Sequence, residues 1–330
     1  MSRQSWGELA TAMVVAVAFA GSAAVPAAAQ EKLSVRLDFA PWGVQAAMHL
    51  ANQQGLFKAA GLEVDVQDGR GSGNTIQLVN AGQVDVGQVQ VGLLGAARTQ
   101  GAALKAIATI MPKTDLCVLV DKASPMTKAA DLKGKTTVVF AASPWAPLID
   151  PYLKAGGLTR DTATIDFVDP AALWGTYIAK RADGLMSTAS SAVPVAEASR
   201  PSKCLWASDA GLNFMSYGLV VKEDTLAKRG PVLKKLIETQ QRAWEQIRKN
   251  PDDGVKAMLA ARPDARLDPA VQRSQIVMSL DFFETPATKG KPIGWQATAD
   301  WEATLKTLEG AGVVKPGWKA DDYFTNALMD

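Results

Sequence analysis

The chain has 330 residues, of which 48% are hydrophobic and 21% are charged, and its formal net charge is +2. This composition is typical of a globular protein, and the length is sufficient for two lobes with a buried core each. A charge so close to neutral gives no electrostatic basis for binding nucleic acid or an acidic membrane surface.

The N-terminal segment has the organisation of a secretory signal peptide. Arg3 precedes an apolar run from Leu9 to Ala20, Pro26 then interrupts the helix, and Ala27–Ala29 offers an A-x-A cleavage site before Gln30. We therefore predict a signal peptide over residues 1–29 and a soluble, exported mature protein. The alternative is an uncleaved membrane anchor, because the segment from the apolar run to the cleavage site carries no charge.

The remaining chain begins with short strands alternating with helices. Leu33, Val35 and Leu37 alternate with polar residues, which is typical of a half-buried strand. The same reasoning predicts strands over 32–40, 62–67, 83–88 and 104–111, and helices over 45–57, 75–81 and 93–100. Regular alternation of this kind indicates an α/β fold with a mostly parallel sheet.

The strand and helix pattern then restarts and ends in a helical tail. Strands are predicted over 115–122, 135–142, 164–169, 184–186 and 216–224, with helices over 147–155 and 171–180. A helix is predicted to begin near Pro231, at a position that suits proline in a first turn. Further helices are predicted over 252–261, 269–280, 296–308 and 321–329.

The order of these elements predicts two lobes. The first sheet would have one bare face unless the C-terminal helices cover it, so we expect a discontinuous lobe I over 31–113 and 222–330. Lobe II would then be an insertion over 114–221. The chain would cross between the lobes near Thr114 and Val221, and these two crossings would act as a hinge.

The two cysteines, Cys117 and Cys204, leave two possibilities open. An exported protein with two cysteines can form one disulfide, and the alternative is a pair of buried, reduced thiols. Two cysteines with a single histidine are too few for a zinc site. We expect no metal and no cofactor.

Several stretches, in order along the chain, resemble a known family. They are LDFAPW (37–42), NQQGLFKAAGLEVDV (52–66), GSGNTIQLVNAGQVDVGQ (71–88), DLKGKTTVV (131–139), TKGKPIG (288–294) and KADDYFTN (319–326). Together they resemble the nitrate/sulfonate/taurine and thiamine-pyrimidine group of periplasmic binding proteins. The resemblance implies a type II periplasmic-binding fold, a location in the periplasm, and a monomer that delivers a small molecule to an ABC permease and ATPase.

Two departures from the family bear on function. Gln45 stands where the thiamine-pyrimidine relatives commonly have histidine, and the only histidine, His49, lies one turn further along the predicted helix. The cysteine-rich iron motif of the related pyrimidine synthases is absent, and no catalytic motif is present. We therefore expect a binding protein and not an enzyme. The alternatives are an exported pyrimidine-synthase-like enzyme and a binding protein that reports to a sensor receptor.

Candidate ligand-binding residues follow the predicted strands, because open α/β sheets bind ligands at the carboxyl ends of their strands. In lobe I they are Trp42, Gln45, Gly71, Ser72, Gly73, Asn74 and Gln88. Trp42 offers a stacking surface, and the glycines allow a ligand to approach the backbone at a helix N-terminus. Ser72 and Asn74 could equally cap that helix.

The opposing wall is expected from lobe II. Its candidates are Ser143, Trp145, Trp174 and Ser187. Ser143 followed by Pro144 predicts a second helix N-terminus at the cleft. Two helix N-termini favour an anionic group and three tryptophans favour a ring. The expected ligand is a small organic anion, with aromatic carboxylate, sulfonate and pyrimidine-like compounds all fitting, captured when the lobes close over it.

Overall fold

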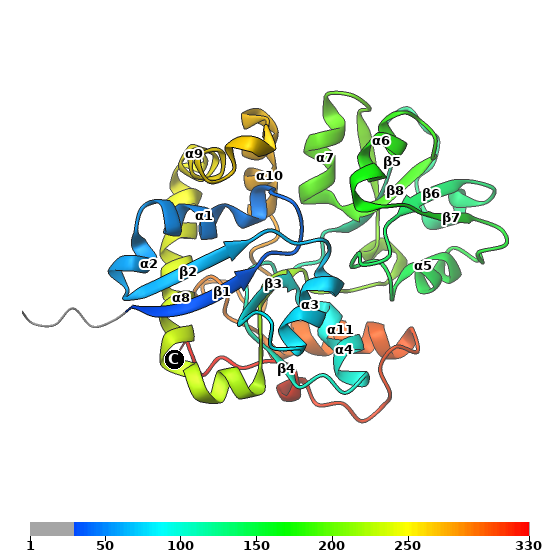
Figure 1. Cartoon of the computed structure of the whole chain (residues 1–330). Coiled ribbons are helices and arrows are strands. Elements are labelled where there is room, and N and C mark those ends of the chain that lie inside the picture. The colour runs from blue at the N-terminus through cyan, green and yellow to red at the C-terminus, as the bar shows by residue number, and fades with distance from the viewer. Residues whose placement is uncertain (1–29, 330) are drawn as a thin grey trace, which may run out of the picture.

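The computed structural model describes residues 30–329. The predicted signal peptide and its cleavage site lie outside the described residues. Within them, no helix combines the length and apolar character needed to cross a membrane. The chain forms two lobes, each built around a five-stranded sheet, with the second lobe coloured green in Figure 1. The predicted α/β fold class is confirmed.

The sheet of lobe I has the strand order β2-β1-β3-β10-β4. Its strands are β1 (Glu31–Arg36), β2 (Leu62–Gln67), β3 (Val86–Gln90), β4 (Leu104–Thr109) and β10 (Tyr217–Lys222). β1 pairs in parallel with β2 and β3, whereas β10 runs antiparallel to β3 and β4. The helices that follow the first strands are α1 (Ala46–Gln53), α2 (Leu56–Ala59), α3 (Ser72–Asn80) and α4 (Leu94–Thr99).

The position of β10 corrects the predicted lobe boundary. Residues 217–221 were expected in lobe II, but they form most of a strand between β3 and β4 in the sheet of lobe I. A buried strand needs neighbours to satisfy its backbone, and β3 and β4 provide them on the two sides of β10. The second crossing between the lobes therefore lies before Tyr217 and after the last strand of lobe II.

The sheet of lobe II has the order β7-β6-β8-β5-β9. Its elements are β5 (Leu116–Asp121), β6 (Thr136–Val139), α5 (Ile149–Ala155), β7 (Thr164–Phe167), α6 (Leu173–Ile178), β8 (Gly184–Thr188), α7 (Ala189–Glu197) and β9 (Ser202–Trp206). Neither α7 nor β9 was predicted from the sequence. Pro194 lies inside α7 and weakens its helical pattern, and β9 is a short strand next to β5.

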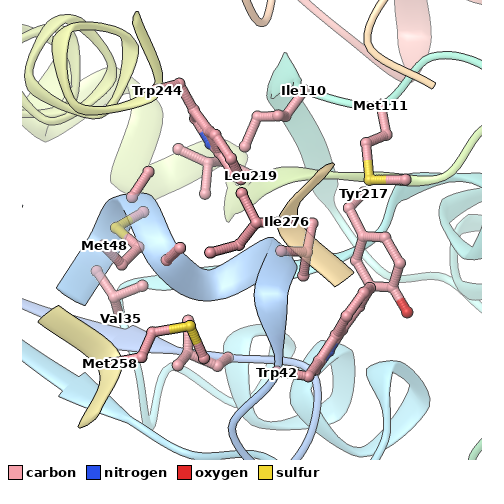
Figure 2. Close-up of a cluster of buried hydrophobic side chains, with 14 of the residues drawn as sticks. Val35, Trp42, Met48, Ile110, Met111, Tyr217, Leu219, Trp244, Met258 and Ile276 are labelled. Carbon is pink, nitrogen blue, oxygen red and sulfur yellow. The ribbon is translucent and has the colours of Figure 1, made fainter. Parts of the chain in front are cut away.

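The predicted C-terminal tail covers both faces of the first sheet, with α8 beside α1 on one face and α11 beside α4 on the other. Its helices are α8 (Glu223–Lys249), α9 (Pro251–Ala261), α10 (Pro269–Leu280) and α11 (Thr298–Gly310). α8 is interrupted at Arg229, where φ is −127°, so Pro231 does stand near the start of a helical segment. α1 packs against α8 and α9, and Figure 2 shows the buried side chains that join them, among them Met48, Trp244 and Met258.

The predicted helix over 321–329 is wrong. Only a short 3-10 turn forms (Ala320–Asp322), and the chain then pairs with the edge of the first sheet. Ala106 donates its backbone N–H to Tyr323, and Thr325 donates back to Ala106. The segment therefore satisfies its backbone against β4, and this tertiary pairing overrides its local helical preference.

Of the two possibilities for the cysteines, the structure contains the disulfide. Cys117 on β5 and Cys204 on β9 are bonded, with their Cα atoms 5.4 Å apart. The two strands are antiparallel neighbours, and Cys204 lies opposite Leu119, two residues from Cys117. The bond therefore holds an edge strand of lobe II to the strand that leaves the hinge.

Candidate functional site

A small chamber lies between the two lobes. It leaves about 40 Å³ open to the centre of a water-sized sphere, which is room for a few water molecules. The residues around this inner chamber are Asp38, Phe39, Trp42, Gly71, Ser72 and Tyr217 from lobe I, and Phe140, Ser143, Pro144, Leu173, Trp174, Met186, Ser187, Thr188 and Ser191 from lobe II.

The lobe I wall is a bonded unit formed where β1 ends. The indole N–H of Trp42 donates to the Asp38 carboxylate at 3.1 Å, and Gln45 Nε2 donates to the same carboxylate at 3.0 Å. Gln45 Oε1 in turn accepts the backbone N–H of Trp42 at 3.3 Å. Burial raises the pKa of Asp38 to about 6, although these hydrogen bonds oppose the shift. A buried carboxylate is thus presented to the chamber in a fixed orientation.

Tyr217 extends this wall toward the hinge. Its ring meets Trp42 edge to face, with centroids 5.1 Å apart, and Figure 2 shows the two rings together at the margin of the buried cluster. Burial raises the pKa of Tyr217 well above its ordinary value of 10, and the nearby Asp38 and Asp115 carboxylates add to the shift. The tyrosine is therefore a neutral phenol between two buried acidic groups.

Asp115 lies in the first crossing between the lobes and joins them. Its carboxylate accepts the hydroxyls of Ser190 from lobe II and Ser216 from the second crossing, the latter at 2.7 Å. Burial raises its pKa to about 6. Among the described residues that line the inner chamber there is no arginine or lysine. The fixed charge around the chamber is consequently acidic.

The lobes meet at the start of α3. The N–H of Gly73 donates to the carbonyl of Ala142 at 3.3 Å, and the ring of Phe39 stacks on Phe140 with centroids 5.3 Å apart. Gly71 has a φ of 118°, and a Cβ there would lie 2.7 Å from the same carbonyl oxygen. Only glycine permits this backbone approach.

The lobe II wall holds a polar atom without a partner. Ser143 is buried, and within residues 30–329 its Oγ has no hydrogen-bond partner. Trp174 is half-buried beside it, and Ser187 and Thr188 close the wall at the end of β8. A buried hydroxyl that lacks a partner costs free energy unless a ligand or water satisfies it.

The structure brings six of the predicted residues to the inner chamber and leaves five outside its lining. Those at the chamber are Trp42, Gly71, Ser72, Ser143, Trp174 and Ser187. Gly73 and Asn74 instead line a neighbouring groove on the other side of α3. Gln45, Gln88 and Trp145 are buried within their own lobes.

Each of the three buried residues has bonding partners in its own lobe. Gln45 bonds Asp38 and its own loop, and Gln88 donates to Val44 while accepting from Gln240. Trp145 donates its indole N–H to the carbonyl of Ser187 at 2.8 Å and packs edge to face on Tyr152. Their polar atoms form hydrogen bonds within their own lobe, so these side chains direct no free polar group at a ligand.

The predicted helix start at Ser143 is also wrong. α5 begins at Ile149, and residues 141–148 form successive turns. The N–H groups of Ala146 and Leu148 bond back to Ser143 and Trp145 within those turns. One of the two helix N-termini that favoured an anion is therefore absent, and the other has already donated one N–H to Ala142.

Sequence reasoning missed the chemistry of Asp38 and Tyr217. Asp38 is absent from the predicted ligand-binding residues, yet it bonds Trp42 and Gln45 and lines the chamber. The position of Asp38 just after a strand was the available signal. Tyr217 could be found only by placing β10 in the first sheet, which no local pattern indicates.

Known proteins resemble this chain in sequence and in fold. Residues 43–254 match the family described as NMT1/THI5 like. A formylaminopyrimidine-binding protein from Halalkalibacterium halodurans is 23% identical over 315 residues, which cover 90% of this chain and 91% of that protein.

Solved structures show the same two-lobed architecture. The alkanesulfonate-binding protein SsuA from Xanthomonas axonopodis pv. citri, bound to MOPS, is 17% identical with a TM-score of 0.68, covering 90% of this chain and 100% of that one. The nitrate-binding protein NrtA from Synechocystis PCC 6803 is 13% identical with a TM-score of 0.68, covering 91% and 87%. These likenesses show that the fold is that of periplasmic binding proteins.

Proposed function

The chain belongs to the NMT1/THI5-like family, and on that premise we propose that it is the periplasmic solute-binding component of an ABC importer. The small chamber between the two lobes supports a role in capture. The ligand first contacts lobe I, lobe II then closes over it, and the closed form docks on the permease and ATPase.

The ligand class follows from the charge around the chamber. Asp38 presents a buried carboxylate, and no arginine or lysine among the described lining residues balances it. A carboxylate or sulfonate placed there would meet a like charge at low dielectric. Of the three predicted ligand classes, a pyrimidine-like ring is therefore the best fit, because its amino group or protonated ring nitrogen donates to a carboxylate.

The aromatic residues complete this proposal. Trp42, Tyr217 and Phe39 form the lobe I side of the chamber, and Phe140 and Trp174 form the lobe II side. Such walls suit a flat ring, since offset and edge-to-face contacts add stability beyond area burial. Ser143 Oγ, which has no partner among the described residues, would gain one from the ring or its substituent.

The arrangement favours binding over catalysis. His49, the single histidine of the chain, is buried in α1 and does not line the chamber. Burial lowers its pKa to about 4, with the Arg262 charge contributing, so it is neutral at physiological pH. It is too remote to act as a general base on a ligand held at Asp38.

Isothermal titration calorimetry with the mature chain tests this function. The probes are 4-aminopyrimidine, benzoate and benzenesulfonate, which share a flat ring and differ in charge. We expect micromolar binding of 4-aminopyrimidine, about −8 kcal/mol, and no measurable binding of the two anions. The proposed ligand class is wrong if either anion binds more tightly than the aminopyrimidine.

A further inference from the structure

A second space adjoins the inner chamber on the outer side. This outer groove leaves about 610 Å³ open to the centre of a water-sized sphere, and its lining includes Phe39, Trp42, Trp174 and Ser191, which also line the inner chamber. The two spaces therefore lie next to each other along one aromatic wall. A ring held at Asp38 would leave the outer groove free for a substituent.

One charged side chain of lobe I lines the outer groove and lacks a partner. Arg70 is exposed, and it forms no ion pair or hydrogen bond within the described residues. Its backbone is nevertheless fixed, because Gly69 donates to Phe39 and Gly71 donates to Asp38 on either side of it. Asp169, across the groove in lobe II, is already engaged with the N–H of Ala171 at 2.8 Å. Asp169 keeps its negative charge, so Arg70 is the positive group on the lobe I side of the mouth, without a partner among the described residues.

A buried amide in the same groove lacks a donor. Gln272 on α10 is 4% exposed, and its Oε1 has no hydrogen-bond partner among the described residues. Gln275, one turn later, has both ends of its amide occupied, accepting from Gly43 and donating to Ser191 across the lobes. The two glutamines line the same groove, and only Gln272 offers a free acceptor.

From this geometry we infer that the ligand is bipartite. Its ring occupies the inner chamber, and a substituent in the outer groove carries an oxyanion toward Arg70 and an N–H or O–H donor toward Gln272. The inference rests on the proposed binding function and adds a second recognition element to it. It also places the anionic group of the ligand at the mouth, away from the Asp38 carboxylate.

Calorimetry with matched compounds tests this inference. The probes are 4-aminopyrimidine, the amide-linked glycine conjugate of 4-aminopyrimidine-5-carboxylic acid, its neutral glycinamide counterpart, and a glycolate ester that lacks the linking N–H. We expect the glycine conjugate to bind about fivefold more tightly than the glycinamide, the upper range for a solvent-exposed ion pair. We expect it to bind roughly fivefold more tightly than the ester, as for one hydrogen bond.

Two variants test which residue causes each gain in affinity. Arg70→Gln should remove the preference for the acid over the glycinamide, and Gln272→Leu should remove the preference for the amide over the ester. Arg181→Gln, which changes an exposed arginine of lobe II outside the groove, should retain both preferences. Circular dichroism checks that every variant is folded.

The outcomes separate this inference from the proposed function. If 4-aminopyrimidine binds and the glycine conjugate gains nothing over it, the outer subsite is refuted while the function stands. If Arg70→Gln retains the full preference for the acid, the assignment to Arg70 is refuted. If no compound binds, both the function and the inference fail.

Discussion

The two walls of the chamber are built differently. On the lobe I side, Asp38, Trp42 and Gln45 bond one another, so the wall is ordered before any ligand arrives. On the lobe II side, Ser143 has a buried hydroxyl without a partner among the described residues, and it lies in a run of turns instead of a helix. The first wall is preorganised for recognition, and the second is completed by the ligand.

The largest expected effect distinguishes a structural tryptophan from a binding tryptophan within lobe II. Trp145→Ala should lower the free energy of unfolding by about 3–5 kcal/mol, because it empties a buried site packed on Tyr152. Trp174→Ala should leave stability nearly unchanged and weaken 4-aminopyrimidine binding roughly tenfold. Urea unfolding and calorimetry on both variants check this. Equal losses of affinity in the two variants would contradict the division.

The next effect tests how far lobe II depends on its disulfide. Replacing Cys117 and Cys204 together by alanine should lower the free energy of unfolding by about 2–4 kcal/mol, since the bond closes a separation of 87 residues. Ligand affinity should change little, because neither cysteine lines the chamber. Urea titration of the double variant beside the oxidised protein measures this. An unchanged transition midpoint would show that the strand pairing of β5 and β9 suffices.

A smaller effect tests the preorganised wall of lobe I. Asp38→Asn keeps the shape of the side chain and removes its charge, so 4-aminopyrimidine should bind about 10- to 100-fold more weakly. Asp65→Asn, at an exposed position of β2, is the matched control and should have no effect. Calorimetry at one pH compares the three proteins. If Asp38→Asn retains the affinity of the unchanged protein, the proposed contact between the Asp38 carboxylate and the ligand is wrong.

The smallest effect is a pH dependence of the same wall. The folded protein raises the pKa of Asp38 from the ordinary 3.8 to about 6. Protonated Asp38 therefore stabilises the fold at low pH, and this contribution is lost as the pH rises through about 6. A cationic probe needs the ionised form. Benzamidine, which stays protonated throughout, should therefore bind about tenfold more weakly at pH 5 than well above pH 6.

Asp115 titrates in the same range, so a control is needed. The pH dependence should be absent in Asp38→Asn if Asp38 is its source. If the pH dependence persists unchanged in that variant, Asp115 and its serine partners at the crossing are responsible. The pH-sensitive step would then be closure of the lobes, and not the contact between Asp38 and the ligand.

The sequence predicted the architecture better than the details of the site. Alternating apolar residues predicted most strands correctly, because that pattern follows directly from the burial of one sheet face. Gly71 and Gly73 were predicted to let a ligand approach the backbone, and in this structure the backbone of Ala142 approaches them instead. The assignment of β10 to lobe I failed because sheet membership depends on which strands are neighbours, and no short-range pattern records this.

Local patterns also misjudged which polar residues face the ligand. Gln45, Gln88 and Trp145 follow strands as expected, yet their polar atoms are occupied by backbone and side chains of their own lobe. Position after a strand predicts proximity to the cleft, whereas orientation depends on packing. Ser143 was placed correctly for the wrong reason, since it reaches the chamber from a turn and not from a helix cap.

The contact between Gly73 and Ala142 joins main chain to main chain. Its strength does not depend on which side chains line the chamber. Wall residues such as Trp174 and Ser187 can therefore be exchanged, by drift or by design, without disturbing this contact between the lobes. This separation makes the fold a suitable scaffold for biosensors, in which new ligand specificity is introduced at the walls while the proposed closing movement provides an unchanged readout.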